Sequence, residues 1–286
     1  MTEALVNRVL APSFLDGPGS RLVFFLQGCD LACGYCHNPE TWSACGHCGR
    51  CLPACPGGAL ALAGGAVVHD PDRCLGCDRC LAACPAHASP RCRTLDVDAV
   101  LALARTWAPY VDGVTFSGGE CTLQGPFLRE CLPRLRAELG LETLLDTNGN
   151  LPAPVLETLL AVAGGFLVDL KSLDPEVHRR LTGAGNGTIL ANLRRTAQAG
   201  RLAEVRHVLI PGHTDDPAQV LALARLVQEL GPAVPLRLIP FRPQGVRGAF
   251  AQVPALDPAR FRALCAPARA LLGGRLKTRE AAPCTC

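Results

Sequence analysis

Cysteine is the residue type in this sequence whose spacing most clearly predicts chemistry. Cys29, Cys33 and Cys36 form a C-x3-C-x2-C run directly after the apolar segment 22–26. Three thiolates in one short loop can hold three corners of a [4Fe–4S] cube and leave its fourth iron without a protein ligand, an open position of the kind that catalytic metal centres keep. The run therefore predicts an iron–sulfur centre that binds an outside ligand. The alternative for these residues alone is a set of buried thiols or a zinc site that lacks a ligand.

Two further cysteine runs share the spacing C-x2-C-x2-C-x3-C and are each followed by proline. They are Cys45, Cys48, Cys51 and Cys55, and Cys74, Cys77, Cys80 and Cys84. In bacterial two-cluster ferredoxins, three cysteines of one such run and the last of the other ligate each [4Fe–4S] cluster. By that rule the predicted ligand sets are Cys45, Cys48, Cys51 and Cys84, and Cys74, Cys77, Cys80 and Cys55. A pair of zinc sites is the alternative, and the duplicated run with its trailing proline favours iron–sulfur clusters.

Composition limits the class of protein. The chain has 286 residues, of which 49% are hydrophobic and 19% charged, enough for one large α/β domain or a domain with a small module. Its net charge of +3 is spread along the chain, so charge gives no case for nucleic acid or a membrane surface. No apolar run of about 18 residues and no export signal is present. We expect a cytoplasmic monomer, in which 17 cysteines indicate metal rather than disulfides.

Strand and helix patterns alternate along the chain. Strands are predicted at residues 21–26, 113–116, 142–145, 165–170, 204–210 and 234–239. Helices are predicted at residues 96–107, 124–139, 154–163, 175–181 with 189–199, 217–230 and 258–272. Three of these helices begin at an Asp–Pro pair, at residues 174–175, 216–217 and 257–258. The alternation predicts a parallel sheet with right-handed crossovers, and six units are too few for a closed eight-unit barrel. We therefore expect an α/β fold with an open, partial (β/α)6 barrel.

The same patterns predict how the chain is divided. Residues 1–42 and 94–274 are assigned to the barrel, and residues 43–93 to a ferredoxin-like insertion between the first strand and its helix. Residues 275–286 are a tail without periodicity, which we expect to be mobile. The remaining cysteines are expected to be isolated thiols without a chemical role: Cys92, Cys121, Cys131, Cys265, Cys284 and Cys286.

Polar motifs follow each predicted strand at its carboxyl end. After the cysteine loop they are Ser117-Gly118-Gly119-Glu120, Asp146-Thr147-Asn148-Gly149, Asp169-Leu170-Lys171, Pro211-Gly212-His213 and Pro240-Phe241-Arg242. Parallel barrels build their active sites at that face, so the motifs are predicted to share one cavity. Each motif alone has a plainer alternative: a turn for the Gly-Gly-Glu segment, a solvated carboxylate for each strand-end aspartate, and a loop residue for His213.

Together these residues carry a resemblance to a known family. The cysteine loop with the aromatic Tyr35 and the motifs after the strands resemble those of radical S-adenosylmethionine (SAM) enzymes. More narrowly, three segments resemble the glycyl-radical-enzyme activating enzymes, and with the insertion the pattern is most similar to the YjjW-like activases. These segments are Asp16-Gly17-Pro18-Gly19-Ser20-Arg21, Gln27-Gly28-Cys29 and Tyr35-Cys36-His37-Asn38-Pro39.

The resemblance implies a reaction and its cofactors. The open iron would chelate the amino and carboxylate groups of SAM, and one electron would break the S–C5′ bond. The resulting 5′-deoxyadenosyl radical would take a hydrogen from a glycine Cα in a partner enzyme. The implied cofactors are SAM and three [4Fe–4S] clusters, with flavodoxin or ferredoxin as electron donor. The two extra clusters would relay electrons, dock the partner or stabilise the insertion, and we favour the relay.

The resemblance also implies contacts to SAM. Gly118, Gly119 and Glu120 would meet its methionine part, and Tyr35, Cys36 and His37 its adenine. Asp146 with Thr147 and Asn148, and Asp169 with Leu170, would meet the ribose or hold a monovalent cation beside the carboxylate. Lys171 is one of only two lysines, the other being Lys277, so its compact ammonium is expected to face the SAM carboxylate.

Three positions need separate mention. Asp16 resembles the family position that contacts the incoming glycyl loop, although Asp-Gly-Pro-Gly is also a good turn. Arg242 stands where the family often has histidine, and an arginine there can still donate to ribose or carboxylate. Cys121 stands where a small apolar residue or proline is commoner.

Two rival functions stay open at this point. One is another radical SAM reaction on a peptide or small molecule, against which the Asp-Gly-Pro-Gly loop argues. The other is a non-enzymatic electron carrier, which would leave the barrel motifs without a purpose.

Overall fold

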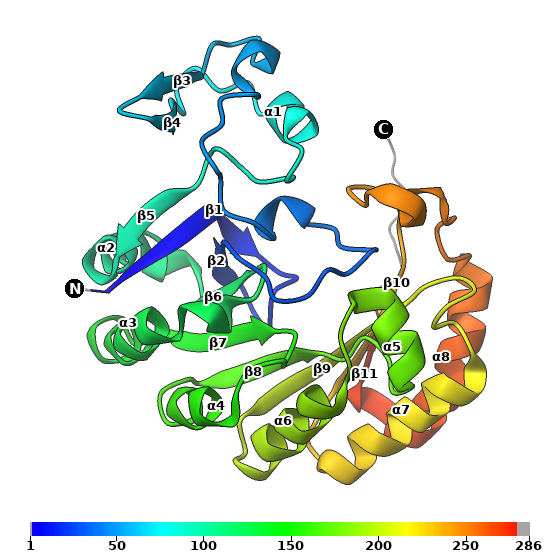
Figure 1. Cartoon of the computed structure of the whole chain (residues 1–286). Coiled ribbons are helices and arrows are strands. Elements are labelled where there is room, and N and C mark those ends of the chain that lie inside the picture. Colours follow the sequence, from blue (N-terminus) through cyan, green and yellow to red (C-terminus); the bar gives the residue numbers. More distant parts are fainter. Residues whose placement is uncertain (1, 279–286) are drawn as a thin grey trace. The chain divides into compact units, whose positions relative to one another are not determined.

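The computed structural model describes residues 2–278 (Figure 1). Contacts between residues divide the chain into two compact units. Unit 1 comprises Met1–Asp30 and Asn38–Thr143, and unit 2 comprises Leu31–His37 and Leu144–Cys286. The division therefore passes through the C-x3-C-x2-C loop and through strand β7 (Glu142–Thr147). Among the described residues, no helix has the length and apolar character that crossing a membrane requires.

Unit 1 contains four main strands in the order β5-β1-β2-β6. They are β1 (Glu3–Ser13), β2 (Arg21–Leu26), β5 (Arg93–Asp96) and β6 (Gly113–Gly118). β2 and β6 are parallel, while β1 runs antiparallel to both of its neighbours. The predicted strands at β2 and β6 are confirmed. β1 was not predicted, because register shifts between Val6 and Arg8 and between Leu10 and Ser13 break its alternation of apolar and polar residues.

The centre of unit 1 is β2, all six residues of which are buried. A continuous apolar run of this kind fits a strand covered on both faces. The Phe24 ring stacks on that of Phe116 in β6, with 5.4 Å between centroids. Helices α2 (Val97–Trp107) and α3 (Gly125–Leu139) match the predicted positions. The Asp96 side chain caps α2 by accepting from Ala99 N at 2.8 Å.

Between β2 and β5 the chain forms a small group of short elements (Figure 1). They are η1 (Pro39–Thr41), η2 (Leu52–Ala54), β3 (Leu60–Ala63), β4 (Ala66–His69) and α1 (Arg79–Ala83). β3 and β4 pair as a hairpin whose two turn residues are glycines with φ of 57° and 78°. In residues 43–93 the buried hydrophobic residues are Cys51, Ala59, Leu60, Val67, Leu81 and Ala88. Of these, Cys51, Leu60 and Val67 form one cluster. So small a core gives this segment little hydrophobic stabilisation.

Unit 2 is a parallel sheet covered by helices. Its strands follow the order β7-β8-β9-β10-β11, with β8 (Gly165–Asp169), β9 (Leu202–Leu209), β10 (Leu236–Pro240) and β11 (Leu276–Thr278). Its helices are α4 (Ala153–Leu160), α5 (Pro175–Thr182), α6 (Gly187–Gln198), α7 (Pro217–Leu230) and α8 (Pro258–Leu272). The remaining 3-10 turns of the chain are η3 (Ala108–Tyr110), η4 (Cys121–Gln124), η5 (Gly248–Gln252) and η6 (Gly273–Arg275). The predicted α/β class with mostly parallel strands is confirmed.

Helix starts in unit 2 follow their Asp–Pro pairs. Asp174, Asp216 and Asp257 each accept a hydrogen bond from the first turn of the helix that follows, at 2.7–3.1 Å. The chain end departs from the prediction, because β11 lies in the segment predicted to lack structure and pairs with β10. The rest of that predicted tail, with Cys284 and Cys286, lies outside the described residues.

Candidate cofactor site and cysteine-lined cavities

The loop that leaves β2 is fixed by backbone hydrogen bonds in unit 1. Gly28 N donates to Thr41 O at 2.7 Å, and Cys29 N donates to Trp42 O at 3.1 Å. The first cysteine of the C-x3-C-x2-C run therefore lies on a backbone held by the segment that follows the run. Because thiolate ligands need fixed positions, a held backbone suits a ligand loop.

The Gly118-Gly119-Glu120 segment packs directly on this loop. Gly119 N donates to Leu26 O at 3.0 Å and Glu120 N to Gly28 O at 2.7 Å. A Cβ on Gly119 would lie 2.1 Å from Gly28 O, and Gly118 has φ of 114°, so both positions require glycine. Glu120 is fully buried, and its Oε1 accepts from Thr122 N at 3.0 Å and Thr122 Oγ1 at 2.6 Å. The segment is thus part of the packing around Cys29 rather than an isolated turn.

Gln27 connects β2 to the segment that leads into the insertion, a role that the sequence did not predict. Its Nε2 donates to Glu40 O at 2.8 Å and Ser43 O at 2.6 Å, and its Oε1 accepts from Asn7 Nδ2 at 2.8 Å. The Cys92 thiol also donates to this oxygen, at 3.2 Å. Gln27 is 4% exposed, so the network is centred on a buried side chain, although Ser43 is exposed and Cys92 half-buried. A glutamine at the end of an apolar strand was the available signal.

The loop with Asp16 is held to β6. Ser13 Oγ donates to Asp16 Oδ2, and Thr115 Oγ1 donates to Asp16 O at 2.8 Å. Arg21 of the same motif is fully buried, and its Nη1 lies 2.7 Å from Glu142 Oε2. Burial lowers the pKa of Arg21 while Glu142 opposes that shift. Asp16 itself is half-buried.

In unit 2, the segment with Cys33 and Cys36 is held by the end of α5. Ala32 N donates to Thr182 O at 3.0 Å, and Gly34 N donates to Leu181 O at 2.9 Å. Cys36 N donates a hydrogen bond to Cys33 O at 3.0 Å, so the two cysteines lie on one turn. Both ends of the cysteine loop are therefore anchored, each within its own unit.

Tyr35 is buried between aromatic and charged neighbours of unit 2. Its ring lies 6.1 Å from that of Phe250, and Lys171 Nζ lies 6.0 Å from its ring centroid. Burial raises the pKa of the Tyr35 hydroxyl, so the group is a neutral donor. Among the described residues, this buried hydroxyl has no hydrogen-bond partner. A buried orphan donor is uncommon, and a polar ligand would satisfy it.

His37 is oriented by the loop after β10. Its Nε2 donates to Arg242 O at 2.8 Å, and a Cβ on Gly245 would lie 3.1 Å from His37 O. Burial lowers the pKa of His37, so the imidazole is neutral. The Arg242 residue is exposed. Its backbone carbonyl, rather than its guanidinium, makes the contact to the cysteine loop in this structure.

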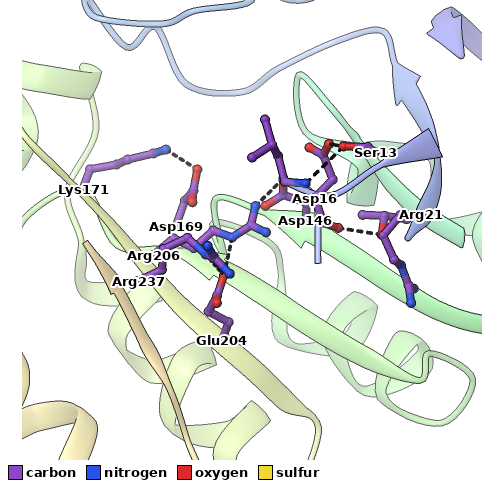
Figure 2. Close-up of polar contacts among 11 residues, drawn as sticks. Ser13, Asp16, Arg21, Asp146, Asp169, Lys171, Glu204, Arg206 and Arg237 are labelled. Atoms are coloured by element: carbon purple, nitrogen blue, oxygen red, sulfur yellow. Dashed lines mark hydrogen bonds and ion pairs between the residues drawn. The ribbon is translucent and has the colours of Figure 1, made fainter. Parts of the chain in front are cut away.

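Lys171 is held by Asp169 at the end of β8. Lys171 Nζ lies 2.6 Å from Asp169 Oδ2, and the lysine side chain is 13% exposed (Figure 2). Burial lowers the pKa of Lys171, but the Asp169 carboxylate outweighs it and the pKa lies well above its ordinary value. The site therefore keeps a charged ammonium in a position with little water.

Asp146 belongs to a buried charge network that the sequence analysis missed. Arg206 Nη1 lies 3.1 Å from Asp146 Oδ2, and Arg206 Nε lies 2.8 Å from Glu204 Oε1. Arg237 Nε binds the same Glu204 oxygen at 2.7 Å (Figure 2). Burial lowers the pKa of Arg206, but the two carboxylates outweigh it and raise the pKa above its ordinary value. The signal in the sequence was the pair of opposite charges two residues apart in a predicted buried strand.

The remaining predicted residues shape the loops after β7 and β8. Thr147 Oγ1 accepts from Gly149 N at 3.0 Å, and Asn148 Oδ1 accepts from Asn150 N at 2.7 Å. Leu170 is fully buried and donates its N–H to Arg206 O at 2.9 Å. These three residues fix the backbone beside Asp146 and Lys171.

Two cavities in the inserted segment are each lined by four cysteines. The first cavity has Cys45, Cys48, Cys51 and Cys84. The second cavity has Cys55, Cys74, Cys77 and Cys80. Each cavity thus takes three cysteines from one run and the last cysteine of the other. Thiolates arranged around a cavity are suitable donors for an iron–sulfur cube. In residues 2–278, no three His, Cys, Asp or Glu side chains are close enough to share a single metal ion.

Other cysteines lie apart from these cavities. Cys121, Cys131 and Cys265 are at most 3% exposed and behave as small core residues. Burial raises the pKa of Cys131 to about 12 and that of Cys92 to about 11. These thiols are therefore protonated at neutral pH.

The chain is similar to proteins of one known family. Residues 23–224 match the Radical SAM superfamily model. A pyruvate formate-lyase-activating enzyme of Streptococcus mutans is 32% identical over 247 residues, which are 84% of this chain and 78% of that protein. A crystal structure of a domain of such an enzyme from Bacteroides vulgatus has 25% identity and a TM-score of 0.50, and covers 59% of this chain and 99% of that one. A radical SAM methyltransferase from Sphaerobacter thermophilus shares the fold, with 18% identity, a TM-score of 0.57, and coverage of 91% and 66%.

Proposed function

Because this chain belongs to the radical SAM superfamily and, within it, to the glycyl-radical-enzyme activating enzymes, we propose that it removes one hydrogen atom from a glycine Cα of a partner enzyme. The observation that carries the proposal is the C-x3-C-x2-C loop inside the matched segment, with both of its ends anchored. A radical SAM family match of this extent disfavours a simple electron carrier.

Cys29, Cys33 and Cys36 would hold three irons of a [4Fe–4S] cluster. When bound, this cluster and SAM together supply the one-electron cleavage that yields the hydrogen-abstracting group. The chain's own contribution is position and exclusion of water. Trp42 fixes the backbone of Cys29, and the end of α5 fixes that of the Cys33–Cys36 turn. These two anchors support the ligand assignment.

Lys171 would bind the SAM carboxylate. Its ammonium is buried, charged and already oriented by Asp169, so a second carboxylate would meet a fixed donor. Gly118 and Gly119 would offer bare backbone to the methionine part, with Glu120 beside them. The close packing of both glycines on the backbone of the cysteine loop holds this segment beside Cys29, which supports that role.

The adenosine part would lie against the other motifs. Tyr35 has an unpaired buried hydroxyl in the described part of the chain, which supports a polar ligand nearby. Cys36 and His37 would present backbone to the adenine, and Arg242 would act through its carbonyl on His37. The Asp146 carboxylate pairs with Arg206, and the Asp169 carboxylate pairs with Lys171. We assign these two carboxylates to ribose hydroxyls, with a monovalent cation as the alternative. Thr147, Asn148 and Leu170 would hold the strand ends in place.

Residues 43–93 would form a ferredoxin-like insertion with two [4Fe–4S] clusters, as in the YjjW-like branch. The two four-cysteine cavities support this assignment. Trp42 O contacts Cys29 N, and Cys45 is three residues further on, a reach of at most about 11 Å. The first cavity would therefore be the inner centre of an electron relay. Flavodoxin or ferredoxin would donate to the outer one.

Asp16 would contact the glycyl loop of the partner. Its loop is held to β6 by Thr115 while its carboxylate is half-buried, which supports a preformed acceptor. The partner would be a soluble glycyl-radical enzyme, bound by a single copy of this chain in the cytoplasm.

The first experiment measures SAM cleavage by the anaerobically reconstituted protein under dithionite. We expect 5′-deoxyadenosine and methionine as products, and we expect Cys33→Ala to abolish them. Cys131→Ala is the matched control, because Cys131 is a buried core thiol away from the motifs. An unchanged rate in Cys33→Ala would overturn the site assignment.

The second experiment tests the partner by electron paramagnetic resonance. Candidate glycyl-radical enzymes are incubated with the reduced protein and SAM, beginning with pyruvate formate-lyase. The expected result is the doublet of a glycyl radical in one candidate. SAM cleavage without a glycyl doublet in any glycyl-radical enzyme of the source organism would favour another radical SAM reaction.

A further inference from the structure

The walls of the two cysteine-lined cavities differ in their polar groups. Apart from its cysteines, the first cavity is lined by glycine, alanine, valine and proline, with Arg50 as its charged neighbour. Arg50 is exposed. The second cavity includes His69, Asp78 and Arg91. The two sets of four cysteines therefore have unequal surroundings.

His69 is the unusual member of the second cavity. It lies at the end of β4, and its Nε2 is buried without a hydrogen-bond partner in the part of the chain that the structure describes. A buried ring nitrogen without a partner loses its hydrogen bonds to water and gains none, so native proteins rarely leave one unpaired. The cavity beside it is lined by thiolates suited to a cluster, whose sulfurs are hydrogen-bond acceptors.

Arg91 and Asp78 complete this wall. Arg91 Nη2 lies 2.7 Å from Asp78 Oδ1, and the side chains are 24% and 62% exposed. Since the pair carries no net charge, its effect on a centre in the cavity is small beside that of a direct donor. His69 is left as the group that distinguishes the two cavities.

We propose that His69 donates a hydrogen bond from Nε2 to a sulfur of the cluster held by Cys55, Cys74, Cys77 and Cys80, and so raises its reduction potential above that of the cluster in the first cavity. This inference rests on the two-cluster insertion proposed above. A hydrogen bond to sulfur stabilises the reduced cluster, because reduction adds negative charge to it. One electron given to the insertion would then reside first on the second cavity's cluster.

The test is a redox titration of the anaerobically reconstituted protein, followed by electron paramagnetic resonance. Wild type is compared with His69→Leu, which removes the donor, and His69→Gln, which keeps an N–H. Cys77→Ser and Cys48→Ser assign the two auxiliary signals, since each changes one cavity. Arg50→Leu is the matched control in the first cavity.

The expected result is a shift to lower potential of the second cavity's signal in His69→Leu. The first cavity's signal should not move, and His69→Gln should recover part of the wild-type value. If the second cavity's signal has the same potential in wild type and His69→Leu while about 12 irons are bound per chain, this inference is overturned. The proposed function of the insertion is then unaffected. About four irons in wild type would mean that no auxiliary clusters form, which overturns the proposed function of the insertion and this inference with it.

Discussion

The inserted segment and the strand-end site hold their functional groups by different means. In the insertion, the cysteines surround cavities, and Cys51, Leu60 and Val67 form one small hydrophobic cluster. At the strand ends of unit 2, Lys171 and Arg206 are held by carboxylates on a buried parallel sheet. The first arrangement depends on what binds in it, whereas the second is complete in the protein alone.

The difference follows from the sizes of the two cores. Metal binding contributes directly to folding where a hydrophobic core is small. A sheet with covered strands stays folded without a ligand, and can keep buried charges paired in advance. The insertion should therefore respond to iron, and the strand-end site to loss of a partner charge.

Iron removal should produce the largest difference between the inserted segment and the strand-end site. With a chelator under anaerobic reducing conditions, residues 43–93 should lose nearly all amide protection, because their small core cannot fold them alone. Strands β2, β6 and β8 should keep theirs. Hydrogen exchange measured by mass spectrometry gives both values in one experiment. If the amides of residues 43–93 stayed fully protected without iron, the insertion would not depend on metal for its folding.

Arg206→Leu should be the most damaging substitution in the sheet. It leaves Asp146 and Glu204 buried without this partner, for which about 3–5 kcal/mol of unfolding free energy is typical. Arg195→Leu is the control, since Arg195 pairs with Glu157 on the surface and should cost no more than about 1 kcal/mol. Urea unfolding measures both. Equal losses in the two variants would contradict a role for burial.

Lys171→Met should weaken SAM binding. A hydrogen bond to a charged group contributes about 1.5–3 kcal/mol, so kcat/KM for SAM should fall roughly 10- to 100-fold, mainly through KM. Lys277→Met is the matched control, because the other lysine is exposed on β11. Steady-state SAM cleavage provides the measurement. A fall confined to kcat would place Lys171 outside the binding contacts.

Gln27→Leu should loosen the connection between β2 and the segment that leads into the insertion. The change removes the Gln27 donor from Glu40 O and Ser43 O, at about 1–3 kcal/mol. The loss should be seen as faster hydrogen exchange at residues 40–45 while β8 is unaffected. Gln198→Leu at the end of α6 serves as the control. Unchanged exchange at residues 40–45 would show that Gln27 is dispensable there.

Cys131 should give the smallest effect at neutral pH, because the ionisation of its thiol affects stability only at high pH. Burial raises its folded pKa to about 12, against about 8.5 for an unfolded thiol. The unfolded chain thus releases the proton first, and this contribution to stability is full below pH 8.5 and is lost as pH rises toward 12. Near pH 10, the free energy of unfolding of wild type should therefore fall by about 1 kcal/mol more per pH unit than that of Cys131→Val. Parallel slopes in urea titrations of the two proteins would refute this.

Much of the fold could be predicted from local pattern. The strands at β2, β6, β7, β8, β9 and β10 and the helices with Asp–Pro starts were found because their signals are short-range. β1 and β11 escaped prediction for a physical reason. Register shifts interrupt the alternation of β1, and β11 is a three-residue strand whose place depends on β10.

The candidate site divides in the same way. The glycines of Gly118-Gly119 were found by motif, but the structure shows what they avoid, namely Gly28 O and the backbone of β2. Donation from the Arg242 side chain to ribose or carboxylate stays a prediction, and the structure adds a contact of the Arg242 carbonyl with His37. No structural role was predicted for Gln27, Arg206 or His69, because their partners lie far from them in the sequence or are absent from the protein.

The sequence by itself determined the cysteine spacing, the order of strands and helices, and the family, because ligand spacing and periodicity are properties of neighbouring residues. Only the tertiary structure decided which carboxylate faces which cation, which carbonyls Gln27 binds, and which cavity includes a histidine. Those pairings depend on strand register and loop packing, and side chains that are distant in sequence meet only after the chain has folded.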